Sequence, residues 1–483
     1  MYLKKINPTP EQRKIFFLEP NRPVLVSGRA GSGKTTTAIL RAAQLVSFYR
    51  RQGIDEPSVG IFVFNNTLSS YLTLLTKEEL NPVNTEVWVF DNWCKTLLKE
   101  NDLLTEEIAD EADCKSCLKL AVQAIDLSSR SPELVNLGLD FLMSEVRYLL
   151  GRFGLDTKSY INSDRIGRGD NPYIDFHTKE AIALDLVPNY TYILATKNYI
   201  DWQLVRNRTL SNIKNASIAF NKYDVLVLDE AQDLSAVQIK LALELVSTRT
   251  NSVTFIRDST QRIYENDYVW NDVNLSFGIN SKIHLEKNYR NTLEIALVAA
   301  NLMESLLIKE SEISILDPKL TKTTGLKPVW FRGKYRYQKR YLYERLRNID
   351  YNLDSVGILH IKAARAREIN NDLISLGFPC IFLKDYTVIQ ETTGIVYTST
   401  LNSVKGLEFD HVFIVGYDSF FAPGNVLHRD TSAHLLGHQK LLYTAITRAK
   451  KTLTITSSIN EYSSFLDEID INLLEIINCH LWN

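Results

Sequence analysis

A glycine-rich segment that ends in lysine and threonine constrains this chain more than any other feature. Residues 28–35 read GRAGSGKT, directly after the apolar residues 24–26 and before a helical pattern over residues 36–48. Glycines at this spacing let backbone N–H groups close on an anion, and the start of the following helix adds a favourable dipole. The strand, loop and helix together predict a site for the phosphates of a nucleoside triphosphate.

The residues of this loop have different expected roles. The Lys34 ammonium is expected to reach the β- and γ-phosphates, and the Thr35 hydroxyl to bind Mg²⁺. The nucleotide-binding prediction from this segment comprises Gly28, Gly31, Ser32, Gly33, Lys34, Thr35 and Thr36.

Two adjacent carboxylates follow an apolar run farther along the chain. Residues 225–228 read VLVL, and Asp229 and Glu230 come next. Phosphoryl transfer needs one group that holds the metal ion and one that orients or deprotonates the attacking water. We therefore predict that Asp229 binds Mg²⁺ and that Glu230 acts on the water.

Short apolar runs recur in two sets, and their pattern indicates the fold class. Continuous β-branched runs without alternation are typical of strands buried on both faces, as in parallel sheets covered by helices. Two such sets predict two α/β domains. The runs are residues 24–26, 61–64, 225–228 and 253–256 in the first set, and 356–359, 395–398, 412–415 and 453–456 in the second.

The region between the second and third runs has a different pattern. Apolar residues at helical spacing over residues 117–125 and 133–150 predict a largely helical insertion in the first domain, with one strand-like run at residues 191–194. A mixed basic and aromatic stretch at residues 331–341 precedes Leu342, Leu346 and Ile349. This spacing favours the exposed face of an amphipathic helix over a nucleic-acid or partner surface.

Composition excludes several classes of protein. The 483 residues carry 55 basic and 57 acidic side chains, so nucleic-acid binding is expected in a local groove. No apolar run reaches 18 residues, which predicts no membrane span, and five cysteines in this length fit a cytoplasmic protein. The pair Cys114 and Cys117 lacks further ligands nearby, so a metal site there is not favoured.

The segment DEAQD at residues 229–233 resembles a box of superfamily 1 helicases of the UvrD/Rep type. Further segments resemble other boxes of that family in the family's order, from about residue 8 to residue 457. They are residues 7–12, 63–68, 89–93, 261–264, 288–292, 400–409 and 443–450.

The resemblance implies two RecA-like domains, with ATP and Mg²⁺ as cofactors. It implies a first domain formed by residues 1–96 and 215–284, a mostly helical insertion at 97–214, and a second domain at 285–483. The family's catalytic roles fall on Lys34, Asp229, Glu230, Gln261, Arg290 and Arg448. Further nucleotide contacts fall on Gln12, Tyr289, Gly406 and Glu408.

Single-stranded DNA is the implied substrate, and the implied contacts are Phe64, Asn65, Trp93, Tyr264, Trp270, Thr400 and Asn402. Two positions depart from the family pattern. Asn402 stands where the family usually has histidine. Asparagine keeps the ability to form hydrogen bonds but lacks the imidazole ring. A tryptophan usual after Tyr264 is absent, so either Tyr264 or Trp270 is expected to stack on bases, unless Trp270 packs in the core.

The chain also departs from larger relatives in size. About a hundred residues separate Arg290 from Thr400, where larger relatives carry a second helical insertion. That insertion is expected to be missing or vestigial. Since the family uses it to regulate unwinding, strong duplex separation by this chain alone is in doubt.

The resemblance implies an ATP-dependent translocase that moves 3′ to 5′ on single-stranded or tailed duplex DNA. A second hypothesis is an ATP-gated DNA sensor that acts through a protein partner such as a nuclease. Compact relatives include helicase-like subunits of phage-defence systems such as Gabija. An RNA-dependent ATPase is a third, less favoured class.

Overall fold

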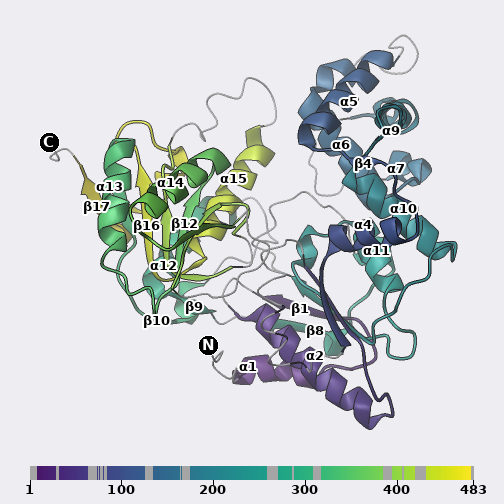
Figure 1. The fold of residues 1–483 in the computed structure, drawn as a ribbon, viewed down its shortest axis with the longest axis horizontal. Coiled ribbons are helices and arrows are strands. Elements are labelled where there is room, and N and C mark those ends of the chain that lie inside the picture. Colours follow the sequence, from purple (N-terminus) through teal and green to yellow (C-terminus); the bar gives the residue numbers. More distant parts are fainter. Residues whose placement is uncertain are drawn as a thin grey trace.

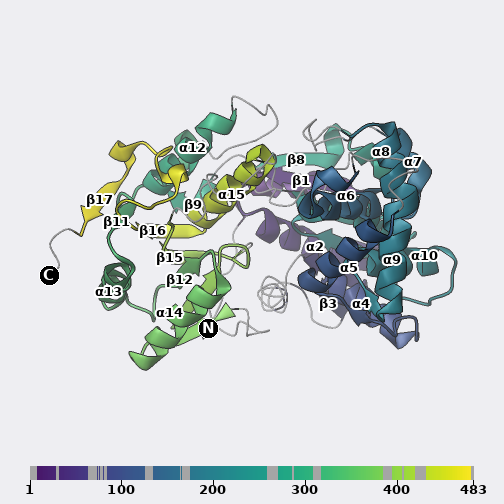
Figure 2. The same cartoon turned by 90° about the horizontal axis from the view of Figure 1, so that it is seen from above.

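The computed structural model describes residues 8–28, 32–63, 73, 76, 80, 84–125, 134–163, 165, 174–257, 270–285, 288–307, 317–383, 394–404, 407–418 and 431–479. These residues form two α/β halves that lie beside each other (Figure 1). A group of helices lies over one end of the first half, and the view from above shows the same division (Figure 2).

The first half is built on a parallel sheet. Within the described residues its strand order is β3-β2-β6-β7-β1-β8, and every pair of neighbours is parallel. The strands are β1 (Val24–Gly28), β2 (Val59–Val63), β3 (Thr85–Val89), β6 (Val225–Leu228), β7 (Val253–Arg257) and β8 (Lys282–Leu285). The helices are α1 (Pro10–Arg13), α2 (Lys34–Arg51), α4 (Phe90–Glu100) and α11 (Ala236–Glu244).

The second half repeats this architecture. Its described strands form a parallel sheet in the order β13-β14-β12-β15-β16-β11-β17. They are β11 (Val329–Arg332), β12 (Val356–His360), β13 (Cys380–Phe382), β14 (Val396–Thr400), β15 (Phe409–Ile414), β16 (Ala449–Ser457) and β17 (Glu475–Asn478). The helices are α12 (Leu293–Leu307), α13 (Tyr335–Leu346), α14 (Ala363–Ser375) and α15 (Thr431–Ile446), and β9 (Asn288–Thr292) pairs with β10 (Thr321–Thr323).

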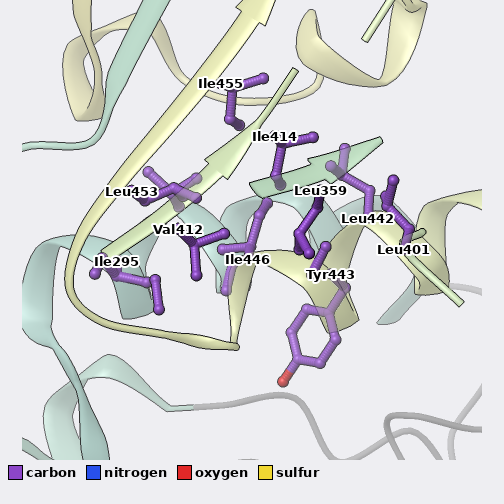
Figure 3. Close-up of a cluster of buried hydrophobic side chains, with 14 of the residues drawn as sticks. Ile295, Leu359, Leu401, Val412, Ile414, Leu442, Tyr443, Ile446, Leu453 and Ile455 are labelled. Atoms are coloured by element: carbon purple, nitrogen blue, oxygen red, sulfur yellow. The ribbon is translucent and has the colours of Figure 1, made fainter. Parts of the chain in front are cut away.

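Both central sheets confirm the predicted fold class. Each of the eight apolar runs overlaps an observed strand, and the central strands β6 and β12 are buried at every residue. Figure 3 shows part of the second half's core, where Leu359, Val412 and Ile455 from three strands lie near Ile446 of α15. Burial on both faces explains why these runs lack a polar alternation.

The helical region has a core of its own, formed by residues between Ala109 and Leu194. Its elements are α5 (Glu111–Ala124), α6 (Leu139–Arg152), α7 (Thr157–Asn162), α8 (Phe176–Ala181) and α9 (Val187–Thr196), with a π-helical turn at Ile182–Leu186 between the last two. The interpretation of residues 191–194 as strand-like is wrong, because they lie within α9. Packing in this core outweighs the β-branched residues' local preference.

Helix α10 (Trp202–Lys214) belongs to the first half instead, since Val205, Leu210 and Ile213 pack in that half's core. The expected boundary at residue 97 falls inside α4, whose buried face lies in the same core. The division we propose therefore gives the insertion the residues between α4 and α10.

Ion pairs join the insertion and α10 to the first half. Arg206 of α10 donates two hydrogen bonds to Asp91 of α4, at 2.6 and 2.7 Å. Arg152 of α6 lies 3.0 Å from Asp272, in the segment that follows β7. The Arg152 side chain is 6% exposed and also lies over the Phe153 ring, while the Asp272 side chain is 25% exposed, so this contact is partly buried.

Residues 317–383 make up most of the interval between Arg290 and Thr400, where a second helical insertion was expected to be missing or vestigial. All the helices and strands described there, from β10 to β13, belong to the second half or its edge. The basic and aromatic stretch at residues 331–341 spans the end of β11 and the first part of α13, where Lys339 is bound to Glu368 and Asp372 of α14. Among the described residues, no helix has the length and apolar character needed to cross a membrane.

Candidate nucleotide site

Parallel sheets bring chemically useful residues together at the carboxyl ends of their strands. In the first half, β1 leads into the glycine-rich loop and β6 leads into Asp229, with β7 between them. The loop and the carboxylates therefore meet at one edge, although 194 positions separate Thr35 from Asp229.

Gly33 joins the loop to the first turn of α2. Its φ of +75° lies in the left-handed region, and a Cβ there would come within 2.4 Å of Gln12 Nε2. The Gln12 side chain donates a hydrogen bond to the Ser32 carbonyl at 3.0 Å, while its Oε1 accepts one from the Thr9 N–H. The residue expected to contact the base thus touches the phosphate loop directly, and glycine is needed where they meet.

Lys34 and Thr35 begin α2 and bind two different strand ends. Lys34 Nζ donates to the Gly28 carbonyl at 3.0 Å, so the ammonium folds back over the loop. Thr35 Oγ1 donates to Asp229 Oδ2 at 2.9 Å. Thr36 lies next along the same helix and is half-buried.

The two carboxylates differ in environment and in backbone conformation. Asp229 is 3% exposed, and burial together with the adjacent Glu230 carboxylate raises its pKa. Glu230 has a φ of +53°, which is rare and costly for a side chain with a Cβ. Its carboxylate accepts a hydrogen bond from the Gln232 amide. A strained residue at a strand end is typical of a functional site.

The oxygens of Thr35 and Asp229 suit a magnesium ion. Mg²⁺ takes hard oxygen ligands in a near-ideal octahedron at about 2.0–2.1 Å. Adjacent corners of that octahedron lie about 3 Å apart. The 2.9 Å separation of Thr35 Oγ1 and Asp229 Oδ2 matches this spacing, so the residues present fit the ion.

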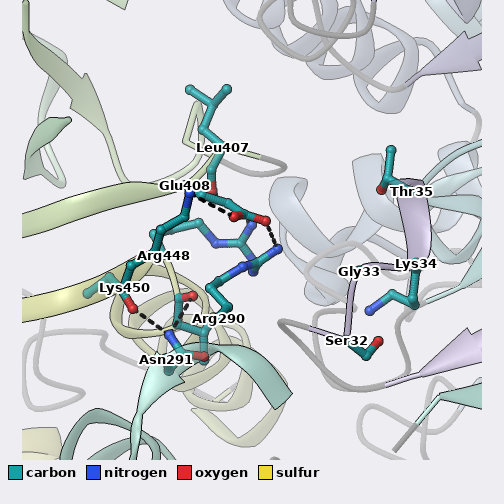
Figure 4. Close-up of polar contacts among 12 residues, drawn as sticks. Ser32, Gly33, Lys34, Thr35, Arg290, Asn291, Leu407, Glu408, Arg448 and Lys450 are labelled. Carbon is teal, nitrogen blue, oxygen red and sulfur yellow. Dashed lines mark hydrogen bonds and ion pairs between the residues drawn. The ribbon is translucent and has the colours of Figure 1, made fainter. Parts of the chain in front are cut away.

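The second half contributes basic residues. Arg290 of β9 forms an ion pair with Glu408, which also lies 3.3 Å from Lys450 Nζ. Arg448 is 2% exposed and donates to the Thr444 and Leu407 carbonyls, at 3.1 and 3.2 Å. Figure 4 shows this group on one side and Ser32, Lys34 and Thr35 of the first half on the other.

Glu408 is held in its charged form by its neighbours. Burial alone would raise its pKa, but the charges of Arg290, Lys450 and Arg448 outweigh burial and lower the pKa to about 2. Asn291 fixes the position of the neighbouring strand, because its side-chain amide donates to the Thr447 and Ala449 carbonyls. The strand that carries Arg290 is thereby tied to the turn that carries Arg448.

Trp93 corrects one expectation about DNA. It is 7% exposed, and its ring packs edge-on against Phe62 at 5.8 Å in the core of the first half. This burial contradicts a contact between the Trp93 ring and a base. The helix α4 buries Phe90, Trp93, Cys94 and Leu97 at helical spacing, which places Trp93 on its inner face.

Trp270 also packs inside the first half. Its ring lies edge-on to Phe255 and Phe277, with centroids 5.2 and 5.0 Å away. These contacts favour the core-packing alternative for Trp270. Thr400 and Asn402 differ, since Thr400 ends β14 and Asn402 follows it; Thr400 is half-buried and Asn402 is exposed.

Several predicted residues lie outside the described residues or have side chains that are not described. Gly31, Phe64, Asn65, Gln261, Tyr264 and Gly406 belong to the first group. Tyr289 belongs to the second, because its backbone lies in β9. The predictions for these residues stay predictions.

Arg41 is a positioning residue that the sequence analysis missed. It is 1% exposed, and it donates to the carbonyls of Ile15, Leu18 and Glu19, at 2.8, 3.2 and 2.7 Å. These contacts hold the segment that follows Gln12 against α2. An arginine on the apolar face of the helix after the loop was the available signal.

No group of metal-binding residues of the histidine, cysteine and carboxylate type occurs in the described parts of the chain. Cys114 and Cys117 are both buried in the insertion core.

Two parallel α/β halves, with a phosphate loop on one and arginines opposite it on the other, define a two-domain P-loop ATPase. Comparison with known families identifies it further. Residues 8–267 match the UvrD/REP helicase N-terminal domain, and residues 384–460 match the UvrD-like helicase C-terminal domain. The chain belongs to the UvrD/REP helicase family, and it is an ATP-hydrolysing DNA helicase of that family.

Curated relatives agree with this family. The chain is 23% identical over 475 residues to a "Probable DNA helicase" of Mycoplasma pneumoniae, covering 95% of this chain and 84% of the relative. It is 20% identical to a "Probable DNA helicase II homolog" of Mycoplasma genitalium, over 64% of this chain and 45% of the relative. A 103-residue stretch is 34% identical to the "ATP-dependent DNA helicase PcrA" of Leuconostoc citreum, covering 19% and 14% of the two chains.

Proposed function

We propose that this helicase is a translocase that moves 3′ to 5′ along single-stranded DNA and couples each step to one ATP hydrolysed between its two halves. The observation that carries the proposal is the facing arrangement of Lys34, Thr35 and Asp229 in one half and Arg290 and Arg448 in the other (Figure 4). A γ-phosphate bound by both groups pulls the halves together, and its loss lets them separate.

Residues of the first half bind and activate the nucleotide. Gln12 contacts the base, Lys34 contacts the β- and γ-phosphates, and Glu230 takes a proton from the attacking water. Thr35 and Asp229 hold Mg²⁺, which neutralises phosphate charge when it is bound. Gln261 is assigned the role of γ-phosphate sensor by resemblance to the family.

Residues of the second half complete the site. Tyr289 stacks on the adenine, and Glu408 lies beside the nucleotide. Arg290 and Arg448 stabilise the charge that develops on the transferred phosphoryl group, a contribution worth about 10³–10⁵ in rate for arginines of this kind. Arg448 must exchange at least part of its carbonyl contacts for phosphate, because its guanidinium is now buried.

The DNA strand lies across the carboxyl-end surfaces of both halves. In the second half it contacts Thr400 and Asn402, which support this path because they lie at the carboxyl end of β14, half-buried and exposed respectively. In the first half we assign the contacts to Phe64, Asn65 and Tyr264. Of the two aromatic residues expected to stack on bases, we assign this role to Tyr264, because Trp270 packs against Phe255 and Phe277.

The partner-gated sensor remains the alternative function. The relatives described above are named as DNA helicases, which favours the helicase. Association with a nuclease or another protein partner is therefore a secondary proposal. It predicts little unwinding by the isolated chain and full activity only with the partner.

Steady-state ATP hydrolysis with and without single-stranded DNA tests the proposal. We expect DNA to stimulate turnover, and Glu230→Gln to lower kcat by about 10³, since general-base catalysis contributes about 10²–10⁴. Glu244→Gln, at the end of α11 in the same half, is the matched control and keeps wild-type turnover.

The same preparation is then given duplexes with a 3′ or a 5′ single-stranded tail. Displacement from the 3′ tail alone supports the proposed direction. Turnover that ignores DNA, yet is lost in Glu230→Gln, favours the partner-gated sensor. Turnover that survives Glu230→Gln overturns the catalytic assignment.

A further inference from the structure

Lys450 and Lys451 are adjacent at the start of β16, yet they bind different carboxylates. Lys450 Nζ lies 3.3 Å from Glu408 Oε2, on the side of the nucleotide site. Lys451 binds Asp354 and lies 3.4 Å from Asp410. The two lysines have similar exposure, 38% and 53%, and therefore differ mainly in the anion that each one meets.

An irregular strand register sets this difference. Phe409 pairs with Ala449 and His411 pairs with Thr452, so β16 holds one residue more than β15 between these two pairs. The extra residue falls at Lys450 and Lys451. A bulge of this kind disrupts the regular ladder and re-aims side chains, and bulges are common beside active sites.

Glu408 is shared between two cations. Arg290 binds its Oε1 atom, and Lys450 lies next to its Oε2 atom (Figure 4). The charge of Arg448 also acts on this carboxylate. Arg290 also has a second anion to bind, because the function proposed above assigns it to the phosphates of ATP.

Transfer of Arg290 from Glu408 to a phosphate leaves the carboxylate with less positive charge around it. A part-buried carboxylate that loses its counter-charge is unfavourable, which opposes the transfer. Lys450 makes the transfer less unfavourable, because its ammonium group stays beside the other carboxylate oxygen, Glu408 Oε2. It also keeps Glu408 at the position where the nucleotide is expected.

We propose that Lys450 is a positioning residue for ATP hydrolysis, which holds Glu408 so that Arg290 can leave it for the phosphoryl group of ATP as charge develops there in the transition state. The proposal rests on the function proposed above. Lys450 acts through Glu408 and makes no contact with the reacting atoms.

Steady-state ATPase measurements on the full chain with saturating DNA test this role. We expect Lys450→Met to lower kcat by about tenfold, less than the 10²–10³ typical of a group that contacts the developing charge itself. Lys451→Met is the matched control, and its kcat stays within about twofold of wild type. Lys450→Arg keeps the positive charge and restores most of the activity.

A double-mutant cycle with Glu408→Gln separates positioning from a merely structural role. Glu408→Gln lowers activity by itself, because Glu408 lies beside the nucleotide. Once its charge is removed, Lys450 has nothing to hold, so adding Lys450→Met changes kcat by less than about twofold. A structural role instead gives two losses that multiply.

Each result decides the proposal. A loss specific to Lys450→Met that disappears in the Glu408→Gln background supports it. An active wild type in which Lys450→Met and Lys451→Met behave alike, or in which the losses multiply, overturns this inference alone. A wild type without ATPase activity overturns the proposed function, and this inference with it.

Discussion

The two halves share an architecture but present opposite chemistry to the nucleotide. The first half offers a loop, a lysine and two carboxylates, and these residues mostly bind one another, as Lys34 binds Gly28 and Thr35 binds Asp229. The second half offers cations gathered around a single carboxylate, Glu408. In each half, these side chains already have polar partners within that half.

In the proposed function, this difference explains how nucleotide binding is coupled to the movement of the two halves. In the first half, Thr35 and Asp229 already have the spacing that Mg²⁺ requires. In the second half, the proposed function requires that arginine contacts to a carboxylate and to carbonyls are exchanged for phosphate contacts. The first half is therefore organised for binding, and the second half for responding to what is bound.

Replacement of Arg290 is the strongest way to break this comparison. We expect Arg290→Gln to lower kcat by about 10³, while the KM for ATP stays within about threefold, because the contact forms mainly in the transition state. ATPase kinetics measure both quantities. The control is Arg340→Gln, an exposed arginine of α13. A large rise in KM with normal kcat would assign Arg290 to ground-state binding and remove the distinction between the halves.

The comparison also predicts that the two halves unfold with different stabilities. If each half unfolds as its own unit, calorimetry shows two transitions, and Trp93→Ala lowers only the one for the first half. The expected loss is about 3–5 kcal/mol, since a large aromatic side chain leaves a core cavity.

Trp330→Ala is the matched substitution in the second half, where Trp330 is 5% exposed and packs in that core. It is expected to lower the other transition. If Trp93→Ala leaves both transitions unchanged but weakens DNA binding, then Trp93 contacts DNA after all and the burial argument fails.

A smaller expected effect is a difference between the halves in how their stability depends on pH. Burial lowers the pKa of His360 in the second half to about 4, whereas an unfolded histidine titrates near 6.5. Between these values the unfolded chain takes up a proton that the folded chain does not, so stability falls as the pH falls. We expect His360 to cost the second half about 2 kcal/mol at pH 5 relative to pH 7.5.

Unfolding of His360→Asn at the two pH values measures this contribution. The variant lacks the titrating ring, so its second transition should fall less on acidification than that of the wild type. The first transition serves as an internal reference. Equal acid sensitivity in both proteins would mean that another group controls the pH dependence of the second half.

Much of the fold follows from local sequence patterns. Apolar runs are short and uninterrupted because their strands are buried on both faces, and all eight were recognisable for that reason. Residues 191–194 misled the interpretation, since a short β-branched run looks the same in a buried helix as in a strand. Strand order was not predictable, because it depends on pairings between distant segments such as β1 and β8.

The candidate site was predictable in its parts and less so in its contacts. The loop and DEAQD segments each carry a spacing that chemistry demands, and the structure brings Thr35 and Asp229 together. Trp93 was assigned from resemblance, although the apolar spacing of Phe90, Trp93 and Leu97 already indicated a buried face. The pairing of Arg290 with Glu408 joins residues 118 positions apart, and no local pattern encodes it.

The strand order of the first sheet also has a consequence for how the chain folds as it leaves the ribosome. Strand β2 pairs with β3 at once, but its other neighbour, β6, is not made until residue 225. β1 must wait still longer, because its partners β7 and β8 begin at residues 253 and 282. The insertion between β3 and β6 has its own core, so it can fold during this delay. The segment that follows β1 is therefore synthesised well before β7 and β8, the two strands between which β1 is held.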